Sequence, residues 1–341
     1  MDPSQELLLR GAAAGAFIAL AGVIARPPLS VSRGSGALFS ISAAAHTITQ
    51  LPTWPALLGI AALPAWVLSV AAPGLFWAFV VTLFDDRKPP LMVLALPSVA
   101  LLVIGAIALA LPSFAAIAWG AHNLVAAALF LHAMFFVWRG WRNDLVEARR
   151  RLRGSVLAAA GLYGVAVVGV QLWELVQGPV DFLSPLAAVL LCLLALAALL
   201  AFVRPHGELF DPLEGRERYV AAEPVDPSID ALARRLDAFM RGELAHRDEN
   251  LSIGALASRL EVPEYRLRRL INQQLGFRNF TAFLNRWRLE EAKRALRDPE
   301  QRAVPISTIA FDCGFGSLGP FNRAFKAETG VTPSAYRARS S

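Results

Sequence analysis

Long apolar runs, separated by short polar stretches, fill residues 1–204 of the chain. Each run is close to the ~20 residues that a helix needs to cross the hydrocarbon core of a bilayer. Two runs are weak as spans, because the second contains His46 and Gln50 and the third contains Pro64 and Pro73. The pattern predicts a seven-helix transmembrane bundle, with spans at about residues 7–25, 36–51, 56–83, 91–110, 113–137, 155–176 and 183–203.

Two pairs of short amphipathic segments follow in the C-terminal third. In the later pair, Ile306, Ile309, Ala310 and Cys313 fall at i, i+3, i+4 and i+7, which is one face of a helix. Gly314 then ends that helix, because glycine readily adopts the left-handed conformation of a sharp turn. A second amphipathic run with exposed cations comes next. Two short helices around a glycine turn are typical of a helix-turn-helix unit.

The earlier pair has the same organisation. Ser252 is placed to cap its first helix, and Pro263 suits the first turn of its second helix, where no backbone N–H is needed. Leu267 begins the apolar face of that second helix. The sequence therefore predicts a soluble α-helical domain with two helix-turn-helix units, near residues 252–275 and 306–329, and an all-α fold for the whole chain.

Three further segments complete the organisation. Residues 205–228 contain four prolines and mixed charges, which is the composition of a linker. An apolar stripe from Ile229 to Phe239 either packs on the C-terminal domain or pairs with a partner helix; its short length favours packing. Between the two units, residues Asn279 to Arg297 form one long amphipathic helix. The C-terminal domain is thus expected at residues 229–341.

Composition and charge separate the two halves. The 341-residue chain is 55% hydrophobic, with a mean hydropathy of +0.47, which is high for a soluble protein. Residues 229–341 contain 19 Lys/Arg and 13 Asp/Glu, a net charge of +6, whereas the remainder contains 14 of each. All of the excess positive charge therefore lies in the C-terminal domain, where a polyanion would be bound.

Basic residues also orient the predicted spans. They occur in alternate loops: Arg26 and Arg33 after the first span, Arg87 and Lys88 after the third, six arginines between 139 and 153 after the fifth, and Arg204 after the seventh. The other inter-span loops contain no Lys or Arg. By the positive-inside rule, the N-terminus lies outside and the C-terminal domain lies in the cytoplasm.

A few polar residues within the spans are candidates for a ligand or proton-sensing pocket: His122, Asn123 and His132 in the fifth span and Glu174 in the sixth. The alternative is that they only form hydrogen bonds between helices, and we favour this interpretation. His122 and His132 are ten positions apart and do not share a helix face, so they do not predict a metal pair.

The remaining chemistry is sparse. Cys192 lies in an apolar run and Cys313 on a buried helix face, so both are expected to be small core residues. Asp2 and Glu6 argue against a cleaved signal peptide. The sequence contains no HExxH, GxSxG or phosphate-binding glycine loop, and we therefore expect no enzyme activity, metal or cofactor.

The C-terminal motifs resemble the signature segment of the AraC/XylS family of transcription regulators. The resemblance covers roughly the last hundred residues, and so many matches at fixed spacing are far more specific than one short motif. Glu261 is a departure, because this turn commonly has glycine there. The matching residues are Ile309-Ala310, Cys313-Gly314-Phe315, Ser317, Phe321, Arg323, Phe325-Lys326, Gly330, Thr332-Pro333 and Tyr336-Arg337.

The resemblance implies base contacts in the first unit from Tyr265, Arg268 and Arg269. The face expected to be exposed on this helix also carries Arg266, with Asn272 beyond it. An arginine fork can bind the O6 and N7 atoms of guanine with two hydrogen bonds, so this helix is the better candidate for base readout.

In the second unit, the corresponding positions are Leu318, Gly319, Asn322 and Arg323. Leu318 and Gly319 lack polar side-chain atoms. We therefore expect this unit to hold phosphates, through Arg323, Lys326 and backbone N–H groups, more than it reads bases. The resemblance also implies that the two units enter successive major-groove faces about 34 Å apart.

These observations predict a membrane-embedded, one-component transcription regulator of the inner (cytoplasmic) membrane. Its cytoplasmic domain would bind double-stranded promoter DNA, and its multi-pass domain would either sense an unknown small-molecule or envelope signal or only anchor the protein. Whether two chains form a homodimer is left open. The rival interpretation is a transporter-like or enzymatic membrane domain fused to an autoregulatory DNA-binding domain.

Overall fold

The computed structural model describes residues 3–85, 89–141, 144–146, 149, 150, 154, 183–203 and 227–339. All of the regular elements in these residues are helices, which confirms the predicted all-α fold; the extended pairing among them is a single-residue bridge between Asp144 and Asn279. Contacts divide the chain into two units. The first comprises residues 1–141 and 148–212, and the second comprises residues 142–147 and 213–341. The predicted domain limits at residues 204 and 229 stay predictions.

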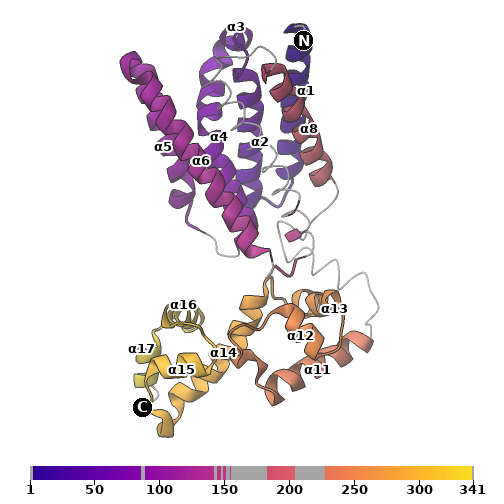
Figure 1. The fold of residues 1–341 in the computed structure, drawn as a ribbon, viewed down its shortest axis with the longest axis vertical. Coiled ribbons are helices and arrows are strands. Elements are labelled where there is room, and N and C mark those ends of the chain that lie inside the picture. The colour runs from indigo at the N-terminus through magenta and orange to yellow at the C-terminus, as the bar shows by residue number, and fades with distance from the viewer. Residues whose placement is uncertain are drawn as a thin grey trace. The chain divides into compact units, whose positions relative to one another are not determined.

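The first unit is a bundle of long apolar helices (Figure 1). Its helices are α1 (Pro3–Ile24), α2 (Val31–Thr49), α3 (Trp54–Leu58), η1 (Gly59–Ala61), α4 (Ala62–Phe84), α5 (Leu91–Ala110), η2 (Pro112–Phe114), α6 (Ala115–Gly140) and α8 (Leu183–Val203). α1 packs against α2 and α8, and α4 packs against α2, α5 and α6. Phe17, Leu20, Phe79, Leu83 and Val137 are among the side chains that form the core.

Five segments of the described chain are long and apolar enough to cross a membrane: Ser4–Ile24, Trp54–Phe84, Leu91–Ala110, Pro112–Gly140 and Pro185–Val203. They correspond to the first, third, fourth, fifth and seventh predicted spans. The second predicted span is a helix, α2, which begins at Val31 and is more polar than these five. The sixth, at 155–176, lies outside the described residues. The number seven therefore stays a prediction.

The break in the third predicted span lies at a different residue from those we expected. We expected Pro64 and Pro73 to interrupt it, but α3 already ends at Leu58, just before Gly59, whose φ of +52° glycine adopts without strain. Pro64 lies in the first turn of α4, where its missing N–H has no helical partner to lose. α4 continues through Pro73 to Phe84.

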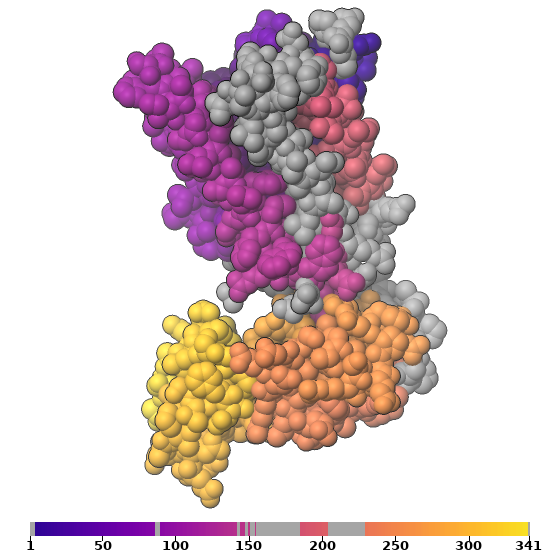
Figure 2. All heavy atoms as spheres, in the orientation of Figure 1, coloured from indigo at the N-terminus to yellow at the C-terminus, as the bar shows by residue number. Residues whose placement is uncertain are grey.

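The second unit consists of shorter helices. These are α11 (Pro227–Gly242), η3 (Ala245–Arg247), α12 (Ile253–Arg259), α13 (Glu264–Arg269), the π-helical turn η4 (Leu270–Gln274), α14 (Phe280–Arg297), η5 (Pro299–Gln301), α15 (Ile306–Asp312), α16 (Leu318–Thr329) and α17 (Pro333–Arg339). Figure 2 shows α11–α13 in orange and α15–α17 in yellow as two adjoining lobes.

Each lobe has its own hydrophobic core, and α14 contributes to both. Phe280, Phe283 and Leu284, near the start of α14, are buried with residues of α11, α12 and α13. Leu289, Ala292 and Leu296, nearer its end, are buried with residues of α15 and α16. The apolar stripe of α11 also packs into the first core, through the buried side chains of Leu236 and Met240, which is the packing alternative that we favoured.

Local sequence explains where these helices begin and end. The Ser252 hydroxyl accepts a hydrogen bond from Ala255 N at 3.1 Å and caps α12, as predicted. Asn279 caps α14 in the same way, through Ala282 N at 2.7 Å. Gly314 has φ +88° and ends the α15 turn, which also confirms the prediction. Cys192 and Cys313 are buried in two different cores, as expected.

Candidate nucleic-acid interface

The first helix-turn-helix unit consists of α12 and α13. Leu267, Leu270 and Ile271 are buried, so the opposite face of α13 is left for a partner. On that face, Tyr265 is 65% exposed and Arg266 is also exposed. Arg269 lies beside them, and its Nε donates to Gln273 Oε1 at 3.0 Å, which holds the guanidinium close to the helix. Two of the predicted base-reading side chains, Tyr265 and Arg269, thus share one face with Arg266.

Arg268 has a different environment. It is 8% exposed, and its Nε donates to Glu264 Oε1 at 2.7 Å. Its Nη1 donates to the carbonyl oxygen of Asp144, also at 2.7 Å. Asn272 is half-buried, and its Nδ2 donates to Phe277 O at 3.0 Å, so it closes the turn that follows η4. The structure therefore places Arg268 and Asn272 in hydrogen bonds within the domain, and their predicted DNA contacts stay predictions.

The second unit consists of α15 and α16, and α16 presents an open polar face. Phe321 and Phe325 are fully buried against the core, whereas Asn322, Arg323 and Lys326 are exposed. Leu318, at the start of α16, is 38% exposed. Gly319 lies beside it, close to the guanidinium of Arg323. The predicted residues of this unit thus occur together on the surface of α16. The helix begins with the apolar residues Leu318 and Gly319, and the cations Arg323 and Lys326 follow them.

Arg288 of α14 joins the two units. It is 7% exposed; its Nε donates to His246 O at 2.7 Å and its Nη2 donates to Asp248 O at 2.9 Å. Its guanidinium also lies 5.7 Å from the centre of the Phe315 ring, in the turn of the second unit. The same segment contacts Gly314, because a Cβ there would lie 2.5 Å from His246 O. Residues before the first unit are therefore packed directly against the turn of the second.

Glu291 lies one turn after Arg288 on α14 and interacts with His246 and Arg247 of η3. Its carboxylate lies 2.7 Å from His246 Nε2 and accepts from Arg247 Nε at 2.9 Å. Burial alone would raise the pKa of Glu291. The hydrogen bonds from His246 and Arg247 outweigh burial and lower the pKa to about 2. Glu291 is therefore ionised near neutral pH and ties η3 to α14.

The turn of the first unit carries backbone strain. Glu261 has φ +51°, in the left-handed region that favours glycine. The sequence departs from glycine at this position, and the turn keeps the left-handed conformation despite the side chain. The Glu261 side chain is 86% exposed and lies 3.9 Å from Arg235, so its contacts offset little of that strain.

In the bundle of long apolar helices, two of the polar residues that we considered as ligand-pocket candidates form hydrogen bonds between helices. His122 is buried, and its Nε2 donates to Val70 O of α4 at 3.1 Å. His132 Nδ1 accepts from Trp77 Nε1 at 3.0 Å. Asn123 is exposed on α6, and Glu174 lies outside the described residues. Which of them serves a ligand stays a prediction.

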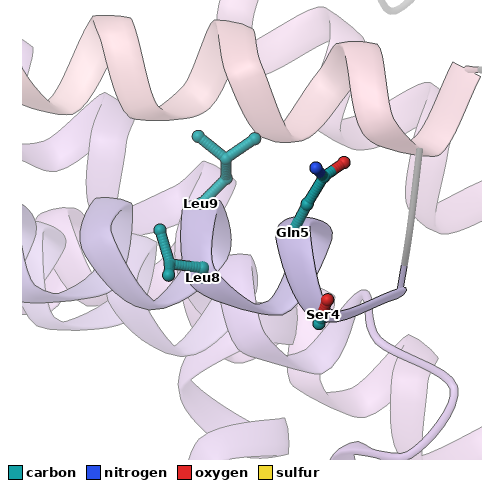
Figure 3. Close-up of a pocket in the computed structure, with 4 residues that line it drawn as sticks. All are labelled: Ser4, Gln5, Leu8 and Leu9. Atoms are coloured by element: carbon teal, nitrogen blue, oxygen red, sulfur yellow. The ribbon is translucent and has the colours of Figure 1, made fainter.

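Sequence reasoning missed a buried ion pair in α1. Arg10 is 2% exposed; its Nε donates to Glu6 Oε1 at 2.9 Å and its Nη1 donates to Thr47 O of α2 at 3.1 Å. The i, i+4 spacing of Glu6 and Arg10 was a signal that could have indicated it. A hollow beside this part of α1 is lined by Ser4, Gln5, Leu8 and Leu9 (Figure 3). These four lining residues all belong to α1.

Sequence reasoning also missed the contacts of Arg288, which connect the two helix-turn-helix units, although the sequence contains a signal for them. Leu284, Arg288 and Ala292 are spaced four apart, which places Arg288 on the buried face of α14. A cation at such a position must find acceptors inside the protein. His246 and Asp144 offered no comparable signal, because their contacts depend on segments that are distant in sequence.

Two short helix pairs, each with a solvent-facing second helix and joined by α14, define a two-unit helix-turn-helix DNA-binding domain. A family model described as a helix-turn-helix domain matches residues 256–339. This C-terminal domain is of the AraC/XylS type, as its motifs predicted.

The individual proteins that this chain resembles are also transcription regulators. The chain is 30% identical over 130 residues to the arabinose operon regulatory proteins of Salmonella typhimurium and Escherichia coli; the match covers 38% of this chain and 44% and 42% of those proteins. It is 34% identical over 89 residues to the HTH-type transcriptional activator RhaS of Pectobacterium carotovorum, which covers 26% of this chain and 30% of that protein. The chain thus spans less than half the length of these relatives. No solved structure matches significantly.

Proposed function

We propose that this chain is a membrane-embedded, one-component transcription regulator. The observation that carries the proposal is the pair of helix-turn-helix units, whose second helices expose Tyr265 and Arg266, with Arg269 half-buried beside them, in one unit and Arg323 and Lys326 in the other. The domain that holds them carries the net positive charge of the chain. Cations on a recognition helix bind phosphates and the guanine edge of the major groove. Its partner would be double-stranded promoter DNA.

The five long apolar segments support membrane embedding. Many of their large apolar side chains are exposed in the described part of the chain, for example Leu96 at 65%, Leu109 at 69% and Leu200 at 71%. Apolar side chains on the outside of such helices suit contact with lipid rather than with water. The proposed location is the inner (cytoplasmic) membrane.

Contacts at one end of the bundle support the proposed orientation. The guanidinium of Arg149, after α6, donates from Nε to Leu83 O at 3.0 Å, near the end of α4. Ser35 Oγ, near the start of α2, lies 2.7 Å from Thr82 Oγ1. The start of α2, the end of α4 and Arg149 therefore lie at the same end of the bundle. Basic loops favour the cytoplasmic side, which puts the C-terminal domain in the same compartment as DNA.

Two roles for the bundle remain to be separated by experiment. As a sensor it would respond to a small-molecule or envelope signal; as an anchor it would only hold the domain at the membrane. Replacing the bundle with an unrelated membrane segment of the same topology distinguishes these roles, because an anchor leaves regulation unchanged. A transporter-like or enzymatic bundle is the rival; flux abolished by His122→Ala would support it.

The DNA-binding proposal is tested with the full-length protein. Cross-linking and immunoprecipitation from cells should recover a small set of promoter fragments. Binding of the purified protein to these fragments should weaken steeply as salt rises, because phosphate contacts release counterions. Recovery of no enriched DNA, together with binding that salt does not affect, would contradict the proposal. Protease added to inverted vesicles, but not to spheroplasts, should remove the C-terminal domain.

A further inference from the structure

A short stretch of chain, Asp144–Val146, belongs by its contacts to the DNA-binding unit although it lies in sequence between two predicted spans. It follows α6 closely and pairs in extended form with the start of α14. Asp144 bridges Asn279, and Leu145 N donates to Arg278 O at 3.0 Å. Asp144 Oδ1 also accepts from Val146 N at 3.0 Å, which fixes the bend of the segment.

The side chains of this segment are anchored in the first helix-turn-helix unit. Leu145 is 3% exposed and belongs to the same core cluster as residues of α11, α12, α13 and α14. Val146 is 4% exposed. The loop around them contains six arginines between residues 139 and 153. An apolar pair within so basic a loop suits a segment that inserts into a protein surface rather than one that stays in solvent.

The same segment covers a residue that is expected to contact DNA. The carbonyl oxygen of Asp144 accepts from Arg268 Nη1 at 2.7 Å, while Glu264 accepts from Arg268 Nε. With both sides of its guanidinium engaged and 8% of its surface exposed, Arg268 is withheld from the groove face that Tyr265 and Arg266 present. Docking of the segment and base contact by Arg268 therefore compete.

We propose that Asp144–Val146 is an internal ligand of the first helix-turn-helix unit, through which the membrane domain controls DNA binding; this rests on the proposed function. When docked, the segment withholds Arg268 from DNA. When released, it frees the guanidinium and the surface around it. The contact consists of one fully inserted leucine and a few hydrogen bonds, so it is small enough to be reversed. Only a few residues of the sequence separate α6 from the segment, which makes the segment the shortest covalent route from this helix to the DNA-binding unit.

A reversible cross-link tests the proposal in the full-length protein in lipid nanodiscs. Cysteines replace Asp144 and Asn279, whose bridge places their Cα atoms within the range that a disulfide spans. The native Cys192 and Cys313 are both buried, and burial raises the pKa of Cys313 to about 12, so the Cys313 thiol does not readily form a thiolate. The probe is a labelled duplex of about 40 base pairs, selected from a random pool by repeated binding to the reduced protein, and long enough for two half-sites one helical turn apart.

The oxidised double variant should bind the selected duplex roughly tenfold more weakly than the same protein after reduction, which is the scale of losing one base-contacting arginine. The single variants Asp144→Cys and Asn279→Cys are the controls, and their binding should not depend on redox state. Equal affinity in the two redox states, or failure of the cysteines to cross-link, would overturn the inference alone. Absence of binding by the reduced protein at low salt would instead contradict the proposed function.

A second pair of variants does not depend on cross-linking. Leu145→Asp places a charge in the core pocket and should release the segment, so DNA binding should become roughly tenfold tighter and independent of the membrane domain. Leu145→Met keeps the volume and should bind as the wild type does. Loss of DNA binding in Leu145→Asp would mean that the segment supports the fold instead, and would overturn the proposal.

Discussion

Replacing Arg288 with methionine should loosen the junction between the two helix-turn-helix units. Methionine keeps the aliphatic contacts of the stem but removes the donors to His246 O and Asp248 O. Hydrogen bonds to a charged group contribute about 1.5–3 kcal/mol each, and the two carbonyl oxygens would lose a buried partner. Because both hydrogen bonds are lost, we expect a total loss of about 3 kcal/mol or more.

Hydrogen–deuterium exchange of the full-length protein in micelles measures this effect locally. Backbone amides of α15 and of the Gly314 turn should exchange at least about a hundredfold faster in Arg288→Met, because 1.4 kcal/mol corresponds to a factor of ten. Arg286→Met is the matched control, since Arg286 is exposed on the other face of α14 and its replacement should change stability by less than about 0.5 kcal/mol. Equal exchange in the two variants would refute the role assigned to Arg288.

Three further predictions concern single side chains. The folded-state pKa of Glu291, about 2, is below its ordinary value of 4.5, so its stabilisation is complete above about pH 5 and is lost as pH falls towards 2; Glu291→Gln should flatten acid unfolding in this window, as followed by circular dichroism. Glu261→Gly should raise the free energy of unfolding by about 0.5–1 kcal/mol, because φ +51° strains a residue with a side chain; an unchanged midpoint in denaturant would contradict this. In DNA titrations, Arg269→Ala should lose about 1–3 kcal/mol for the preferred sequence, whereas Lys326→Ala should weaken all sequences alike and reduce the salt slope by about 1.

Local pattern was sufficient to predict the elements of the DNA-binding domain. The spacing of Ile309, Ala310 and Cys313 fixed one buried face, and Gly314 fixed the turn, because both effects act over a few residues. The long apolar segments were equally visible, since length and hydropathy alone define them. The local pattern was less reliable in the third predicted span, where both Gly59 and Pro64 could end a helix. Gly59 ends α3, whereas the expected break at Pro64 is absent because that proline lies in a first turn.

The pairing of Arg268 could not be read from local pattern. Its partner Asp144 is 124 residues earlier in the chain, in a loop whose charge indicated only the cytoplasmic side. The helical spacing predicted only that Arg268 lies near the other arginines of α13. It contained no information about the extended segment Asp144–Val146, which contacts Arg268. Long-range backbone contacts of this kind depend on tertiary packing, and a periodic pattern contains information only about neighbours on the same element.

α14 connects the two helix-turn-helix units through a shared helix. It has 18 residues, which is about 27 Å at 1.5 Å per residue, and its first turns and its last turns are buried in different cores. Arg288, near its middle, bonds to the segment that also contacts the turn of the second unit. A rod of this length with a unit packed at each end suits two readings about 34 Å apart on one face of a duplex. Because Leu145 shares a core with the first turns of α14, a change in its docking acts on the element that also positions the second unit.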